Sequence, residues 1–102
     1  MFNYVIIAGL NDKDSKQQEI TTDAARAIIA GIVLKYAGGA TLTDCRGIYT
    51  HDDGQIVFET SIKIEVGGID EETALQIAAD VKAALNQESI YFSKFAASVD
   101  FI

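Results

Sequence analysis

Apolar and polar residues recur along the chain with two different periods. Spacing by three and four puts apolar residues on one side of a helix, and alternation by two puts them on one face of a strand. The pattern predicts helices over residues 22–37 and 70–85 and strands over residues 2–10, 40–50, 56–66 and 89–101.

Both predicted helices have recognisable ends. Thr21 or Thr22 can cap the first helix and Asp70 the second, because their side-chain oxygens accept hydrogen bonds from the free N–H groups of a first turn. Gly38-Gly39 follows the first helix, where glycine adopts a left-handed conformation at little cost.

The order of elements, β-α-β-β-α-β, predicts the fold. His51–Gly54 has the composition of a tight turn, which makes the second and third strands a hairpin, and Gly47 predicts a β-bulge in the second strand. One tight turn in this order is the split βαβ arrangement. We therefore predict a single ferredoxin-like α+β domain over residues 1–102, with a four-stranded antiparallel sheet and two helices on one face.

The first strand is apolar on both sides. Phe2, Tyr4 and Ile6 fall on one side, and Val5 and Ile7 on the other. The last strand is also apolar on both sides, although a sheet covered by helices on one face should be polar on the other. A second copy of the chain is the commonest cover for such a face, so we expect a homo-oligomer.

Composition narrows the class of protein. The 102 residues carry a net charge of −7, and the excess of acids lies entirely in the second half. This charge disfavours direct binding to nucleic acid or to an anionic membrane, and it leaves a protein partner with a basic surface possible. Because the chain has neither a basic N-terminal region nor an apolar run long enough for a bilayer, we expect a cytoplasmic protein.

Short motifs spread along much of the chain resemble a known pattern. They are Gly9-Leu10, then Gly39-x-Thr41-x-x-Asp44-x-x-Gly47-x-Tyr49, then Asp53-Gly54-x-Ile56-Val57-x-Glu59-x-Ser61, and finally Gln87-Glu88-Ser89-Ile90. In these motifs the chain is similar to an uncharacterised family of small bacterial and phage-type proteins. The resemblance implies the βαββαβ fold and brings no assigned activity.

Three features have the residue types of catalytic or metal sites. His51 lies beside two aspartates, Cys45 lies beside Arg46, and residues 11–15 carry oxygen ligands at alternate positions. Turn composition explains the histidine, and a structural thiol is the simpler interpretation of the lone cysteine. The 11–15 segment lacks the glycine of a calcium loop. We predict no metal site and no cofactor, and no catalytic set stands out.

A polar cluster on the second and third strands is the strongest candidate site. It comprises Asp44, Arg46, Glu59, Ser61 and Lys63. Alternation places the last three on the sheet face away from the helices. They are either ordinary cross-strand pairs or the floor of a ligand-binding cleft.

Three functions are compatible with these features. The first is a non-enzymatic binding module that acts as a homo-oligomer through its open sheet face. The second is a small, cofactor-free enzyme of the dimeric ferredoxin-like type that acts on a small organic substrate, with Glu59, Arg46 and His51 as candidate groups. The third is an acidic phage-type inhibitor of a host nuclease or defence protein. The lack of a convincing catalytic set favours the first.

Overall fold

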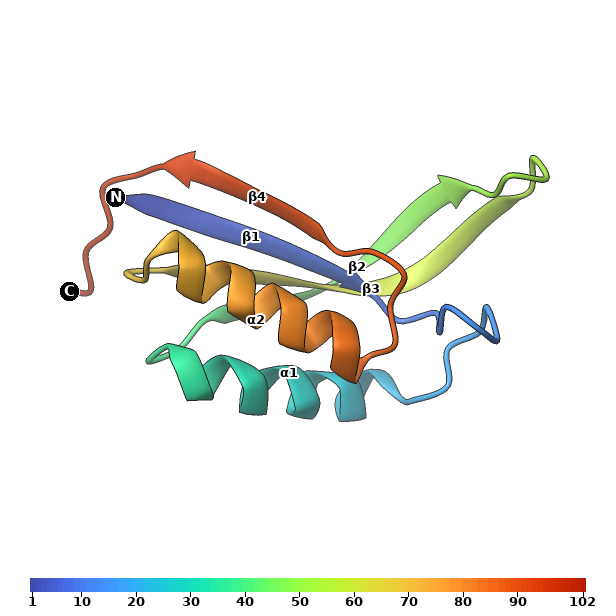
Figure 1. The fold of residues 1–102 in the computed structure, drawn as a ribbon, viewed down its shortest axis with the longest axis horizontal. Helices are drawn as coiled ribbons and strands as arrows, with labels where there is room; N and C mark the ends of the chain where they lie inside the picture. The colour runs from blue at the N-terminus through green and yellow to red at the C-terminus, as the bar shows by residue number, and fades with distance from the viewer.

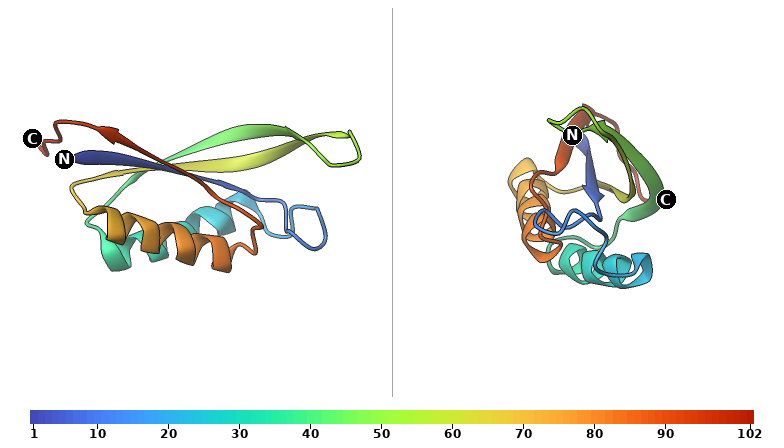
Figure 2. Two further views of the ribbon diagram at one scale, coloured as in Figure 1. Left: turned by 45° about the horizontal axis from the view of Figure 1, so that its top comes forward. Right: turned by 90° about the vertical axis from the view of Figure 1, so that its right-hand side faces the viewer.

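Two helices pack side by side against one face of a four-stranded antiparallel sheet (Figures 1 and 2). The computed structural model describes all of residues 1–102. The elements in chain order are β1 (Phe2–Gly9), α1 (Thr22–Tyr36), β2 (Thr41–Thr50), β3 (Ile56–Gly67), α2 (Glu71–Ala84) and β4 (Tyr91–Ala96).

The strand order is β2-β3-β1-β4, with every neighbouring pair antiparallel. The central strands β1 and β3 pair from Asn3 opposite Gly67 to Gly9 opposite Ser61. This arrangement confirms the predicted ferredoxin-like fold.

The helices begin where their capping residues predict. The Thr21 side chain accepts a hydrogen bond from the Ala24 N–H, and the Asp70 carboxylate accepts one from the Thr73 N–H at 2.8 Å. Hydrogen bonds from Thr73, first from its side chain and then from its backbone N–H, lower the pKa of Asp70 below its ordinary value. Both caps satisfy donors that the first turn of a helix leaves free.

The core lies between the helices and the sheet. Ile6 and Ile64 face each other across β1 and β3, and Ile29 and Ile77 cover them from α1 and α2, all without exposed surface. Removing such side chains from water is the main favourable term in folding this domain. Neither helix has the length and apolarity needed to cross a membrane.

Two local expectations are wrong. The last strand ends at Ala96 instead of continuing to residue 101, because no neighbouring strand pairs with the chain beyond that point. The β2–β3 ladder runs from Thr41 to Thr50 without interruption, so Gly47 makes no bulge. Residues 11–18 form an exposed loop that closes on itself through a bridge between Asn11 and Gln18.

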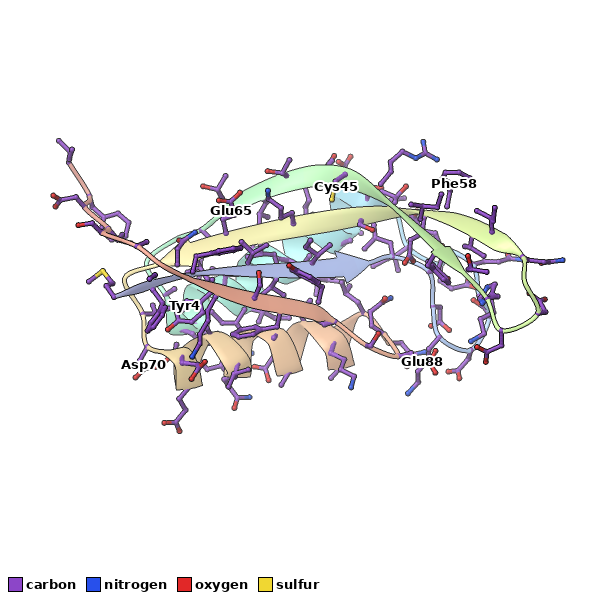
Figure 3. The ribbon with its side chains drawn as sticks, turned by 90° about the horizontal axis from the view of Figure 1, so that it is seen from above. Tyr4, Cys45, Phe58, Glu65, Asp70 and Glu88 are labelled. Atoms are coloured by element: carbon purple, nitrogen blue, oxygen red, sulfur yellow. The ribbon has the colours of Figure 1, made fainter.

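The β2–β3 hairpin extends past the helices as a long arm (Figure 1). Ile56 and Phe58 lie on the face of β3 that is buried further along the strand, yet they are 65% and 63% exposed. Ile48, opposite Phe58 on β2, is equally exposed. The alternation predicted the face correctly, but the helices do not reach this part of it. Figure 3 shows Phe58 on the arm, beyond the end of α2.

A matched pair of truncations on α2 tests the packing. We expect Ile77→Ala to lower the free energy of unfolding by about 2–5 kcal/mol, because it leaves a cavity in the core. Leu75→Ala, two residues away and half exposed, should change it by less than about 1 kcal/mol. Chemical denaturation measures both. Equal losses would contradict the placement of the buried face of α2.

Candidate functional site

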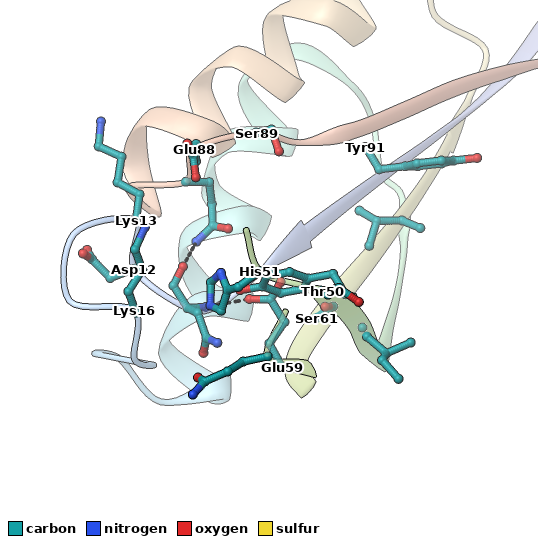
Figure 4. A pocket seen from close by; sticks show the side chains of 18 of the residues that line it. Asp12, Lys13, Lys16, Thr50, His51, Glu59, Ser61, Glu88, Ser89 and Tyr91 are labelled. Carbon is teal, nitrogen blue, oxygen red and sulfur yellow. Dashed lines mark hydrogen bonds between the residues drawn. The ribbon is translucent and has the colours of Figure 1, made fainter. Parts of the chain in front are cut away.

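Three segments enclose an open groove of about 1270 Å³ at the arm end of the molecule (Figure 4). They are the hairpin from Gly47 to Gln55, the loop from Asn11 to Lys16, and the segment from Gln87 to Tyr91 that leads into β4. Glu59 and Ser61 on β3 also line it. The groove therefore brings together three parts of the chain that are far apart in the sequence.

Glu59 lies half buried across the backbones of two glycines on neighbouring strands. A Cβ on Gly9 would come within 2.3 Å of Glu59 Oε1, and a Cβ on Gly47 would lie 3.6 Å from Glu59 Cγ. The Asn11 N–H donates a hydrogen bond of 3.1 Å to Glu59 Oε2. Glycine on both sides thus makes room for a carboxylate held against the sheet.

Ser61 lies next to Glu59 on the same face and is buried. A Cβ on Gly47 would be 3.2 Å from its Oγ, so the same glycine leaves room for both side chains. The Cys45 thiol donates to the Ser61 carbonyl oxygen at 3.6 Å, which gives the cysteine a structural contact beside the site.

The structure separates the five predicted site residues. Asp44 and Arg46 lie opposite Ile62 and Thr60, and therefore on the helix side of the sheet, away from Glu59. Asp44 pairs there with Arg26 of α1. The expected neighbourhood of Arg46 and Glu59 does not form, because the register places Gly47 opposite Glu59.

Lys63 shares the open face with Glu59 but lies outside the groove. Its Nζ pairs with Glu65 Oε1 at 3.1 Å, an ordinary ion pair along one strand. Glu59 and Ser61 are thus the two members of the predicted cluster that line the groove.

Aromatic residues form the walls of the groove. Tyr49 and His51 meet edge to face, with 5.2 Å between ring centroids, and Tyr91 contributes a further wall from β4. Such rings provide flat apolar surfaces on which a planar base can stack. His51, whose position in the sequence is explained by turn composition and which is also a candidate group of the enzyme alternative, lines the same groove as Tyr91.

The loop is tied to the end of α2. The Asn86 side chain donates to Asp12 Oδ2 at 2.7 Å and to Asp14 Oδ2 at 3.0 Å, and the Gln87 side chain donates to the Asn11 carbonyl oxygen at 2.9 Å. Mainly through the Asn86 bond, and then through backbone N–H groups of the loop, the pKa of Asp12 falls below its ordinary value. Asp12 and Asp14 thus serve as hydrogen-bond acceptors within the molecule, and no three His, Cys, Asp or Glu side chains are grouped to hold a metal ion.

The charged residues that line the groove are mainly acidic. Five acids face two lysines there, Asp12, Asp52, Asp53, Glu59 and Glu88 against Lys13 and Lys16. The acids of the α2 first turn, Glu71 and Glu72, lie at the opposite end of the molecule, near Asp70 in Figure 3. The acidic excess therefore does not form one continuous patch.

Comparisons with known proteins agree on the fold. No protein-family model and no curated protein sequence matches the chain. Among solved structures, a phage SAM lyase in the apo state is similar over 92% of this chain and 78% of its own, with a TM-score of 0.72 and 23% identity. The divalent cation tolerance protein CutA from Archaeoglobus fulgidus covers 99% of this chain and 88% of its own, with a TM-score of 0.64 and 14% identity.

A further solved structure combines similarity of fold with a higher sequence identity. It is a phage SAM lyase in complex with S-methyl-5′-thioadenosine, which matches 92% of this chain and 79% of its own, with a TM-score of 0.66 and 26% identity. These similarities support a small ferredoxin-like module. Phage proteins among them agree with the resemblance to small bacterial and phage-type proteins.

Replacing the glycine beneath Glu59 tests the geometry of the site. We expect Gly9→Ala to displace the Glu59 carboxylate and break its bond to the Asn11 N–H, which NMR would record as a shift and faster exchange of the Asn11 amide. The free energy of unfolding should change by less than about 1 kcal/mol, because the lost hydrogen bond is offset by the lower chain entropy of alanine. Gly39→Ala, with open space around it, is the control. An unchanged Asn11 amide would contradict this geometry.

Proposed function

We propose that this chain is a small enzyme that binds S-adenosylmethionine (SAM) in the groove and cleaves it as a lyase. The observation that carries the proposal is the Glu59 carboxylate, fixed over Gly9 by the Asn11 N–H within a groove rich in acids. Similarity to the SAM lyase bound to S-methyl-5′-thioadenosine supports this choice of substrate. The proposal corresponds to the second of the three functions that the sequence allows.

The charge of the substrate suits the groove. SAM is positively charged at its sulfonium, and an anion in a partly desolvated site attracts such a cation more strongly than an anion in open water. Glu59 is half buried and its position is restrained by a hydrogen bond, so it is organised before the ligand arrives. The aromatic walls, Tyr49, His51 and Tyr91, offer stacking surfaces for adenine.

The reaction requires no external oxidant or water. When the bond from sulfur to the four-carbon amino-acid chain breaks, its electron pair moves to sulfur and leaves neutral S-methyl-5′-thioadenosine. The carbon receives an electron pair either from the substrate's own carboxylate, which closes a lactone, or from a C–H bond whose proton a base removes. In the first route Glu59 holds the cationic portion of the substrate in place; in the second it can accept the proton.

Substitution of Glu59 tests the enzyme hypothesis. We expect the purified protein to convert SAM to S-methyl-5′-thioadenosine. Chromatography with mass spectrometry measures this conversion and identifies the four-carbon product. Glu59→Gln should lower kcat/KM by about 10²–10⁴-fold, because it removes the fixed charge. It should change the free energy of unfolding by less than about 1 kcal/mol, because the amide oxygen can still accept from Asn11.

Glu65→Gln is the matched control for this substitution. Glu65 lies on the same face of the same strand but outside the groove, so its loss should leave kcat/KM within about twofold. Binding of S-methyl-5′-thioadenosine without any turnover of SAM would support a non-enzymatic binding module instead. The absence of both binding and turnover would rule out the proposal.

We also propose that the chain acts as a homo-oligomer through the arm as well as the open sheet face. Ile48, Ile56 and Phe58 are each more than 60% exposed, and Tyr91 and Phe95 on the open face are more than half exposed. Ile48 also lines the groove, so a second copy seated on the arm would help to close the site.

Sedimentation at micromolar concentration tests the assembly. We expect a dimer or a larger species, and Phe58→Ser should shift it toward monomer by weakening self-association about tenfold or more. Phe101→Ser, also highly exposed but near the C-terminus and away from the arm, should leave the distribution unchanged. A monomeric wild-type protein at that concentration would contradict the assembly without affecting the assignment of the groove.

A further inference from the structure

Lys13 and Lys16 are the only lysine or arginine residues that line the groove, and both lie on its loop side, beside Asp12 (Figure 4). Neither takes part in an ion pair, although Arg26, Lys63 and Lys94 do. The aspartates nearest to them in the sequence, Asp12 and Asp14, accept hydrogen bonds from Asn86 instead. Two lysines without an ion-pair partner thus lie at the edge of an otherwise acidic groove.

The backbone that carries the two lysines is restrained. The Lys13 N–H donates to the Asn86 carbonyl oxygen at 3.0 Å, and the Lys16 N–H donates to the Asp12 carbonyl oxygen at 2.9 Å. The Asp12 carboxylate accepts from the N–H groups of Asp14 and Ser15, which tightens the turn between the lysines. These bonds set where the two side chains leave the backbone.

Lys16 also has an unusual backbone conformation. Its φ of 64° lies in the left-handed region, which residues with a side chain rarely adopt. A strained residue persists where the surrounding contacts hold it, and such residues concentrate at functional sites. The second non-glycine residue with positive φ is Asn86, which fastens the same loop.

The loop is joined to Glu59 through a single residue. Asn11 donates its N–H to the Glu59 carboxylate, and its carbonyl oxygen accepts from Gln87, so the anion on the groove floor and the start of the loop share one anchor. The Glu59 carboxylate and the backbone of the loop that carries the lysines are thereby held relative to each other. A ligand that carries both a cationic centre and a carboxylate complements the two kinds of charge that line this groove.

We propose that Lys13 and Lys16 bind the carboxylate of the amino-acid portion of the substrate. The groove then selects adenosyl thioethers and sulfoniums that keep this carboxylate over those that have lost it. The inference rests on the proposed function and extends it to the substrate determinant that the two lysines recognise. It assigns them a role in binding and specificity.

Three stable ligands test this assignment by calorimetry. S-Adenosylhomocysteine has the carboxylate, its decarboxylated analogue 5′-deoxy-5′-(3-aminopropylthio)adenosine keeps the amine without it, and S-methyl-5′-thioadenosine lacks both. We expect the wild-type protein to bind S-adenosylhomocysteine about tenfold more tightly than the decarboxylated analogue. The Lys13→Met/Lys16→Met double variant should lose this preference, with the affinity for the other two ligands within about twofold of wild type.

Lys82→Met removes one exposed positive charge from α2, outside the groove, and is the control for the loss of a lysine elsewhere on the surface. Its affinity for S-adenosylhomocysteine should stay within about twofold of wild type. The inference is overturned if the double variant keeps the preference, if the wild type shows none, or if all three ligands weaken equally. Failure of the wild type to bind any of the three would instead overturn the proposed function itself.

Discussion

The antiparallel pairing of β3 with β1 and β2 is the interaction on which the rest of the structure depends. The inner half of β3 supplies Ile62, Ile64 and Val66 to the core, and its outer half forms the arm with β2. Because side chains alternate, the same strand turns Glu59 and Ser61 to the other face. A slip by one residue would exchange the two faces, so the register that builds the core also positions the groove.

Local signals were enough to predict the elements, and longer-range geometry decided where they ended. The caps at Thr21 and Asp70 and the tight turn after β2 depend on neighbouring residues, and all three are present. How far the helices cover the sheet depends on the whole assembly. Phe58 continues the alternation of the buried residues, yet it is exposed because the arm extends beyond the ends of α1 and α2.

The candidate site was also predictable only where it depends on local pattern. The alternation of β3 alone predicts the sheet face on which Glu59 and Ser61 lie. The face on which a β2 side chain lies also depends on whether a bulge interrupts that strand. An uninterrupted ladder keeps Asp44 and Arg46 on the helix side, where Asp44 pairs with Arg26. The contribution of the 11–18 loop could not be inferred, because its anchor Gln87 lies 76 residues from Asn11 in the sequence.

Residues that weaken the scaffold gather around the groove. Gly9 and Gly47 lie in strands that would gain from larger side chains, and Lys16 and Asn86 have positive φ. The first three line the groove, and Asn86 precedes Gln87, which also lines it. Natural sequences depart from local structural preferences mainly where function requires it. Four such departures around one groove favour a ligand site over a simple surface cluster. They favour it at the arm end of the sheet, where the helices leave the strands uncovered.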